Sequence, residues 1–118
     1  MYKRQEWEYA ARSGGKSWAY YPWGAETATC GRAVMHDGSN GCGEDRTSPV
    51  CSKPAGNSRQ GVCDLAGNVW EWTGEREGSA SRVARGGGWD NTASGLRTSN
   101  RGNDPSYRYS RLGFRIAR

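Results

Sequence analysis

The sequence predicts a small, irregular α+β fold that is rich in loops, with one short helix and a small antiparallel sheet. Glycine makes up 18 of the 118 residues and mean hydropathy is −0.96, so long buried elements are not expected. Six tryptophans and six tyrosines still supply enough apolar surface to argue against disorder. The length is that of one domain, so residues 1–118 are expected to form a single domain.

The helix is expected at residues 5–12. Trp7, Ala10 and Ala11 have the i, i+3, i+4 spacing of one buried helical face. The two glycines that follow Ser13 are expected to end the helix, because glycine readily adopts the left-handed conformation of a C-cap.

Three strands are expected at 69–73, 81–85 and 111–118, with a polar turn at 74–81. In the first strand Trp70 and Trp72 alternate with Glu71, which predicts a half-buried strand with the tryptophans on one face and the glutamate on the other. The expected core consists of large apolar side chains that lie outside the polar loops. These are Trp7, Trp23, Trp70, Trp72, Trp89, Phe114 and Ile116.

An aromatic segment at 18–24, broken by Pro22, precedes a long irregular stretch at 25–61. The four cysteines are Cys30, Cys42, Cys51 and Cys63. An even number in a small domain suits two disulfides with three possible pairings, and these bonds would favour an extracellular, virion or cell-surface location. Four buried thiols are the alternative, whereas the lack of a CxxC pair disfavours structural zinc. His36, the only histidine, is expected on a loop.

The charge is +5 and is concentrated near the C-terminus, where residues 81–118 hold eight arginines and two aspartates. Such a basic segment could suit nucleic acid, but no lysine cluster or nucleic-acid motif accompanies it. The arginines are instead expected to brace loops through carbonyls and carboxylates. No stretch approaches the roughly 20 apolar residues of a membrane span, and the N-terminal residues lack the apolar run of a signal peptide.

Residues 90–118 contain no Lys, Glu, Gln, Met or Trp, although the first 89 residues use all five. The residue types that dominate there are those obtained by replacing adenines in an AAC codon. This composition resembles the variable region of a protein diversified by a retroelement. Such variable positions lie within a constant frame of residues like RGGSW…LR…NR…P…R…GFR. The residues of this chain that match the frame are Arg85, Gly86, Gly87, Trp89, Leu96, Arg97, Asn100, Arg101, Pro105, Arg108, Gly113, Phe114 and Arg115. An ordinary polar loop is the alternative interpretation.

Three motifs in order, EWEYAARSGG, DLAGNVWEWT and RGGGW with LGFRIAR, resemble the sulfatase-modifying-factor family of the formylglycine-generating enzyme. The resemblance implies a variant of the C-type lectin fold. The enzymes use two cysteines after the RGGSW motif, one of them to help bind copper, but this chain has no cysteine after Cys63. The sequence therefore predicts a protein without this catalysis and without copper.

The resemblance also implies a calcium site in the loop before the VWEW strand. The implied ligands are the side chains of Asp64 and Glu71 and the backbone carbonyls of Gly67 and Val69. Hard oxygen ligands of this kind suit calcium. The alternative is that the two carboxylates cap the loop or pair with arginine.

The sequence predicts a ligand-binding, receptor or adhesion-type protein, which displays a variable region at about residues 89–112 to an unidentified protein or surface ligand. Tyrosine, serine, glycine and asparagine are also the main residues of antibody binding sites. Tyr107→Ala or Tyr109→Ala is expected to abolish binding with little change in melting temperature. The predicted contact residues are Asp90, Asn91, Thr92, Ser94, Gly95, Asn100, Gly102, Asn103, Asp104, Ser106, Tyr107, Tyr109, Ser110 and Arg111.

Overall fold

The computed structural model describes residues 4–16, 18–77, 81–102 and 112–115. Its one α-helix, α1, spans Arg4–Ala11, and three short 3-10 helices lie at Asn40–Gly43 (η1), Pro54–Gly56 (η2) and Ala93–Leu96 (η3). The strands are β1 (Trp70–Glu77), β2 (Ser81–Arg85), β3 (Arg101–Gly102) and β4 (Leu112–Phe114). The α+β fold with one short helix and a small sheet is therefore as predicted.

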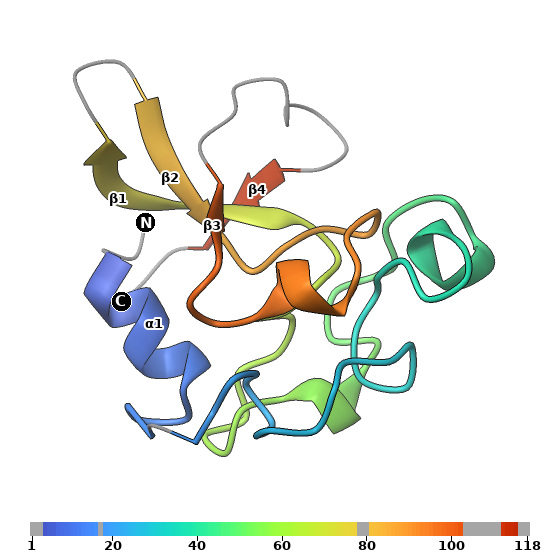
Figure 1. Cartoon of the computed structure of the whole chain (residues 1–118), viewed down its shortest axis with the longest axis horizontal. Helices are drawn as coiled ribbons and strands as arrows, with labels where there is room; N and C mark the ends of the chain where they lie inside the picture. The colour runs from blue at the N-terminus through green and yellow to red at the C-terminus, as the bar shows by residue number, and fades with distance from the viewer. Residues whose placement is uncertain (1–3, 17, 78–80, 103–111, 116–118) are drawn as a thin grey trace.

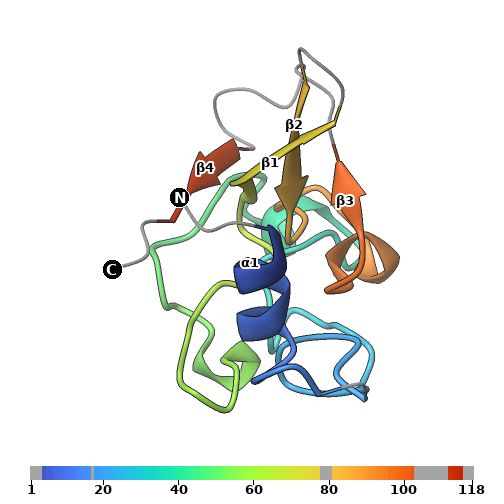
Figure 2. The same ribbon diagram turned by 90° about the vertical axis from the view of Figure 1, so that its left-hand side faces the viewer.

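The four strands form one sheet in the order β3-β2-β1-β4. β2 pairs antiparallel with both β1 and β3, whereas β4 runs parallel to β1. The expectation of a purely antiparallel sheet is thus wrong for the β4 pair. Figure 1 shows the sheet with α1 and the irregular segments beneath it, and Figure 2 shows α1 below the strands from the side.

The helix ends as its sequence predicts. Ser13 and Gly14 have φ of 52° and 88°, and the N–H of Gly14 donates to the carbonyl of Tyr9 at 3.0 Å. Trp7 is 1% exposed and packs with Ala11 and with Leu65 from the loop before β1. The helix therefore supplies one side of the core beneath the sheet.

A second core cluster gathers small and medium side chains from the irregular segments around Tyr21, Met35 and Leu96. Of the predicted core, Trp7, Trp70 and Trp89 are buried, while Trp23 and Trp72 are only half-buried. The side chain of Phe114, and Ile116 as a whole, fall outside what the structure describes. Many small alanines complete this core, which explains how so few aliphatic residues suffice.

The predicted exposure of one face of β1, at Glu71, is wrong. Glu71 was expected on an outer face, but it is 4% exposed, so both faces of the strand are covered at this point. The predicted turn at 74–81 is also wrong over its first half, because β1 continues to Glu77. Backbone pairing with β2 outweighs the polar composition of these residues.

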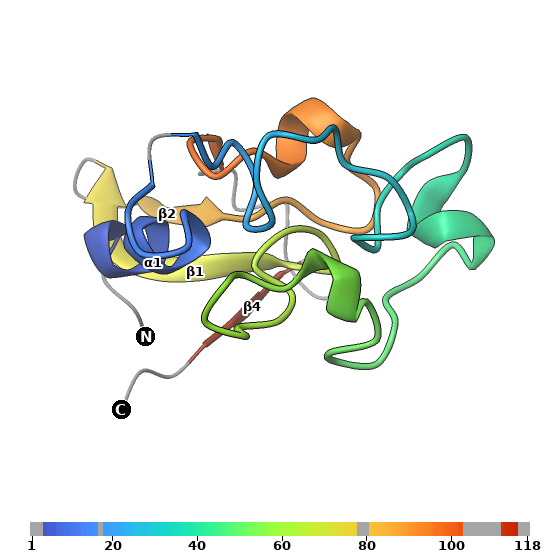
Figure 3. The same cartoon turned by 90° about the horizontal axis from the view of Figure 1, so that it is seen from below.

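All four cysteines are paired, Cys30 with Cys42 and Cys51 with Cys63. These bonds close two loops, residues 30–42 within the irregular stretch and residues 51–63 at its end, and η1 lies at the opposite end of the molecule from α1 (Figures 1 and 3). Among the described residues no helix has the length and apolar content needed to cross a membrane.

Candidate functional site

The segment that carries the predicted contact residues leaves the sheet through a glycine bend. Gly86 and Gly87 have φ of 98° and 71°, a region that side chains disfavour. A β-carbon on Gly87 would lie 2.8 Å from the carbonyl oxygen of Gly95. Glycine therefore lets η3 fold back closely against the end of β2.

Two buried residues fix this segment to the rest of the protein. Leu96 is fully buried in the core cluster with Tyr21. Thr98 is also fully buried, and its hydroxyl donates to the carbonyl of Ala19 at 3.0 Å. Arg85 Nη1 donates to the carbonyl of Thr98 at 3.0 Å, as predicted for a bracing arginine. Its other terminal nitrogen, Nη2, lies 3.2 Å from the carboxylate of Glu8.

The predicted contact residues on either side of these anchors differ in exposure. Thr92 and Ser94 are exposed, whereas Asp90, Asn91 and Asn100 are half-buried. Asn91 accepts the N–H of Gly88 through its side-chain oxygen at 2.8 Å. Asn100 donates to the carbonyl of Gly95 at 3.0 Å. Both asparagines therefore hold the loop in place besides lying at its surface.

Most of the other predicted contact residues lie outside the part of the chain that the structure describes. Gly102 lies in β3. The remaining predicted contact residues, which include both tyrosines, lie outside the described residues: Asn103, Asp104, Ser106, Tyr107, Tyr109, Ser110 and Arg111. The prediction that Tyr107 and Tyr109 dominate binding therefore stays a prediction.

The loop closed by Cys30 and Cys42 supports the same segment from its other side. The backbone N–H of His36 donates to the carbonyl of Asn91 at 2.8 Å, and that of Gly41 donates to Trp89 at 2.7 Å. His36 is a loop residue, as expected, and its Nδ1 lies 2.7 Å from the side-chain oxygen of Asn40. The first disulfide loop thus forms part of the platform beneath residues 89–91.

The four residues of the predicted calcium site lie together. Asp64, Gly67, Val69 and Glu71 all line one pocket of about 180 Å³ at the start of β1. Asp64, Gly67 and Asn68 have positive φ, so the chain makes a tight left-handed turn around the pocket. Asparagine, aspartate and glycine are the residues that adopt this conformation most readily.

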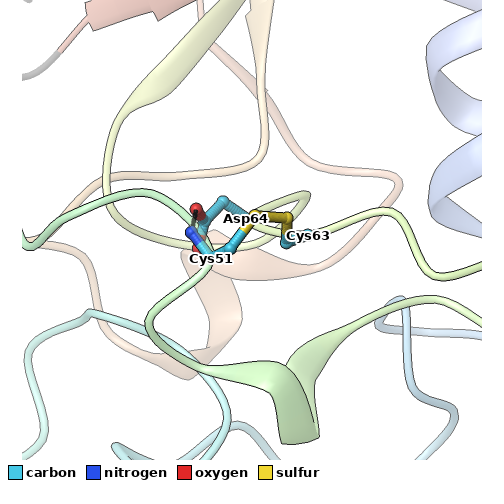
Figure 4. A group of neighbouring side chains, drawn as sticks. All are labelled: Cys51, Cys63 and Asp64. Atoms are coloured by element: carbon cyan, nitrogen blue, oxygen red, sulfur yellow. Dashed lines mark hydrogen bonds between the residues drawn. A yellow bond between two sulfur atoms is a disulfide. The ribbon is translucent and has the colours of Figure 1, made fainter.

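Asp64 faces the second disulfide (Figure 4), and its Oδ2 accepts the N–H of Cys51 at 2.7 Å. The sulfurs of Cys51 and Cys63 and a carboxylate oxygen of Asp64 lie within 4.8 Å of one another. The two sulfurs are bonded to each other, and the thiolate is the form that binds metal. This cluster is therefore not a metal site based on sulfur.

Arg115, the residue directly after β4, also lines this pocket. Its Nε donates to Glu71 Oε1 at 2.7 Å, and its Nη2 donates to the carbonyl of Cys63 at 2.8 Å. Burial raises the pKa of Glu71, while the hydrogen bond and the positive charge of Arg115 act in the opposite direction. The sequence identified Arg115 as a frame residue but not as the partner of Glu71, although a buried carboxylate requires one.

The fold and this pocket define a small, loop-rich α+β domain built around a WEW strand. The whole chain, residues 1–118, matches the model of the sulfatase-modifying factor enzyme 1-like domain, and the protein belongs to this family.

Individual relatives include a protein named as an inactive enzyme and one named as an enzyme. The inactive C-alpha-formylglycine-generating enzyme 2 of Bos taurus is 38% identical over 128 residues, which cover 96% of this chain and 42% of the relative. The formylglycine-generating enzyme of Streptomyces coelicolor is 34% identical over 142 residues, covering 95% and 44%. The chain therefore spans less than half the length of these relatives.

A solved structure, Treponema denticola variable protein 1, superimposes with a TM-score of 0.73 at 26% identity. The match covers 97% of this chain and 45% of the variable protein. The predicted fold is therefore confirmed.

Proposed function

We propose that this protein is a non-catalytic binding protein whose ligand contacts lie on the segment from Trp89 to Leu112, and that a retroelement diversifies this segment. One observation carries the proposal. Leu96 and Thr98 are fully buried, while Thr92 and Ser94, a few residues before them, are exposed. Exposed polar positions can change at little cost to stability, whereas buried anchors cannot. The likeness to a solved variable protein supports the proposal.

The chemistry of the cysteines supports a role without catalysis. All four are bonded in disulfides and no cysteine follows Cys63, so the chain offers no thiolate nucleophile at residues 90–96. The similarity to a relative named inactive is consistent with this role. The two disulfides also suit a location outside the reducing cytosol, at an extracellular, virion or cell surface.

The test of diversification is the sequence around the gene. We expect a second copy of the region that encodes residues 90–115, placed beside a reverse transcriptase gene. The two copies should differ only where the template has adenine, with the differences in codons such as those of Thr92 and Ser94 and not in that of Leu96. Differences at other template bases, or the lack of such a copy in the source genome, would contradict diversification.

Calcium binding in the pocket of Asp64 and Glu71 is a further part of the proposal. The pocket brings together Asp64, Gly67, Val69 and Glu71, whose two carboxylates and two backbone carbonyls would be a ligand set that suits this ion. The guanidinium of Arg115 competes with it, because it already binds both oxygens of Glu71 at 2.7 and 3.3 Å.

Millimolar calcium is therefore expected to raise the melting temperature above that in EDTA, because an ion that binds the folded state stabilises it. Asp64→Asn should reduce the increase. Thermal melts with magnesium in place of calcium serve as the control. An equal increase with both ions, or none with calcium, would contradict the site.

A further inference from the structure

Two exposed aromatic side chains lie beside the candidate binding segment. Trp18 is 38% exposed and Tyr20 is 52% exposed, whereas Ala19 and Tyr21 are buried. This alternation places every second side chain of the segment at the surface. The sequence predicted an aromatic segment here but not which rings face solvent.

The backbone beneath these rings is held firmly. The carbonyls of Ala19 and Tyr20 accept hydrogen bonds from the hydroxyl and the N–H of Thr98, at 3.0 and 2.8 Å. Ser13 donates to the carbonyl of Pro22 at 2.6 Å. The rings are therefore presented on a fixed support, directly beside the segment that contains η3.

An arginine covers each ring. The guanidinium carbon of Arg59 lies 4.6 Å from the ring centroid of Trp18, and that of Arg97 lies 5.7 Å from Tyr20. Both arginines are exposed, and no ion pair with a carboxylate joins either of them to the part of the chain that the structure describes. A guanidinium that stacks on a ring keeps its N–H edge available for a carboxylate.

We propose that Trp18, Tyr20, Arg59 and Arg97 form an aromatic–arginine surface that docks an acidic segment of a partner protein. This inference rests on the proposed binding function and adds a fixed contact area, to which the diversified segment contributes the frame residue Arg97. The stacked guanidiniums bind carboxylates through paired hydrogen bonds, and the rings supply flat contact area to the neighbouring side chains of the partner. The net charge of +5 complements such a partner.

The surface suits carboxylates better than a nucleic-acid backbone. Nucleic-acid binding neutralises a row of phosphates, typically about 6–10 of them, and two arginines cannot do this. One carboxylate also borders the surface: a β-carbon on Gly24 would lie 3.2 Å from Glu26 Oε2 and 3.6 Å from the ring of Trp18. Glu26 therefore limits the positive charge here and provides a way to test it.

The test is an NMR titration of the isotopically labelled full chain with a hexaglutamate peptide at low ionic strength. We expect the largest shift changes at residues 18–20, 59 and 97. Arg59→Met with Arg97→Met should weaken binding about tenfold or more, because two charge-assisted contacts are lost. Glu26→Gln should strengthen it, and hexaglutamine should not bind.

The matched control is Arg32→Met with Arg46→Met, which removes the same charge from half-buried Arg32, stacked on the ring of Trp23, and from exposed Arg46, and should leave affinity nearly unchanged. If this control pair weakened binding of the peptide equally, the effect would be due to net charge alone, and the proposal would be overturned. An unchanged affinity in Arg59→Lys with Arg97→Lys, or tighter binding of a thymidine oligonucleotide through the same arginines, would also overturn it. The diversification proposal is tested by the template copy in the genome and not by this titration. Failure of the docking proposal can therefore be told apart from failure of the diversification proposal.

Discussion

Arg115→Met is expected to lower the free energy of unfolding by about 3–5 kcal/mol, the cost of removing one partner from a buried ion pair. Glu71 is 4% exposed, and Arg115 binds both of its carboxylate oxygens. The same guanidinium donates to the carbonyls of Cys63 and Asp64, so its loss also frees the loop before β1. Urea unfolding followed by tryptophan fluorescence, in EDTA, measures the change.

The effect should depend on pH in one direction. Without Arg115, burial raises the pKa of Glu71 against less opposition, so above the usual range of a glutamate, about pH 4.3, the folded state keeps a proton that the unfolded state has released. The loss of stability should therefore grow as pH rises above that range.

Two variants serve as controls for this experiment. Arg46→Met, at an exposed arginine, should change stability by no more than about 0.5 kcal/mol. Arg115→Met combined with Glu71→Leu should recover much of the loss, because no charge is then buried alone. A single variant as stable as the parent at all pH values would show that the pair does not stabilise the fold.

Leu96→Ala is expected to cost about 2–5 kcal/mol, since it leaves a cavity in the core cluster beside Tyr21 and Met35. Ser94→Ala, two residues earlier in the same 3-10 helix, should cost no more than about 0.5 kcal/mol, because that side chain is exposed. The pair of variants measures the separation of anchor and surface on which the proposed function depends. Guanidinium unfolding curves of both provide the measurement, and similar costs for the two would contradict the separation.

The sequence predicted those elements whose signals are local. The spacing of Trp7, Ala10 and Ala11 identified α1 to within one residue at each end, and the strand expected at 81–85 has the same bounds as β2. The glycines at 86 and 87 indicated the bend, because few other residues adopt its backbone angles. Long aromatic motifs in the correct order identified the family.

The errors concern contacts between distant parts of the chain. Glu71 was placed on an outer face because alternation alone cannot show that Arg115, 44 residues later, covers it. The disulfide pairing could not be derived from four cysteines, and the parallel direction of β4 depends on where the chain goes after β3. The aromatic–arginine surface was missed for the same reason, since Arg59 and Arg97 meet the rings only in three dimensions.

The order β3-β2-β1-β4 places the two ends of the 103–111 connection at opposite edges of the sheet. With strands about 4.8 Å apart, these edges are roughly 14 Å from each other, a gap that about five extended residues can bridge. The connection holds nine residues, which is more than this minimum. Template copying that exchanges bases keeps the number of codons constant, so it cannot detach β4, whereas a deletion of more than about four residues would pull it out of register.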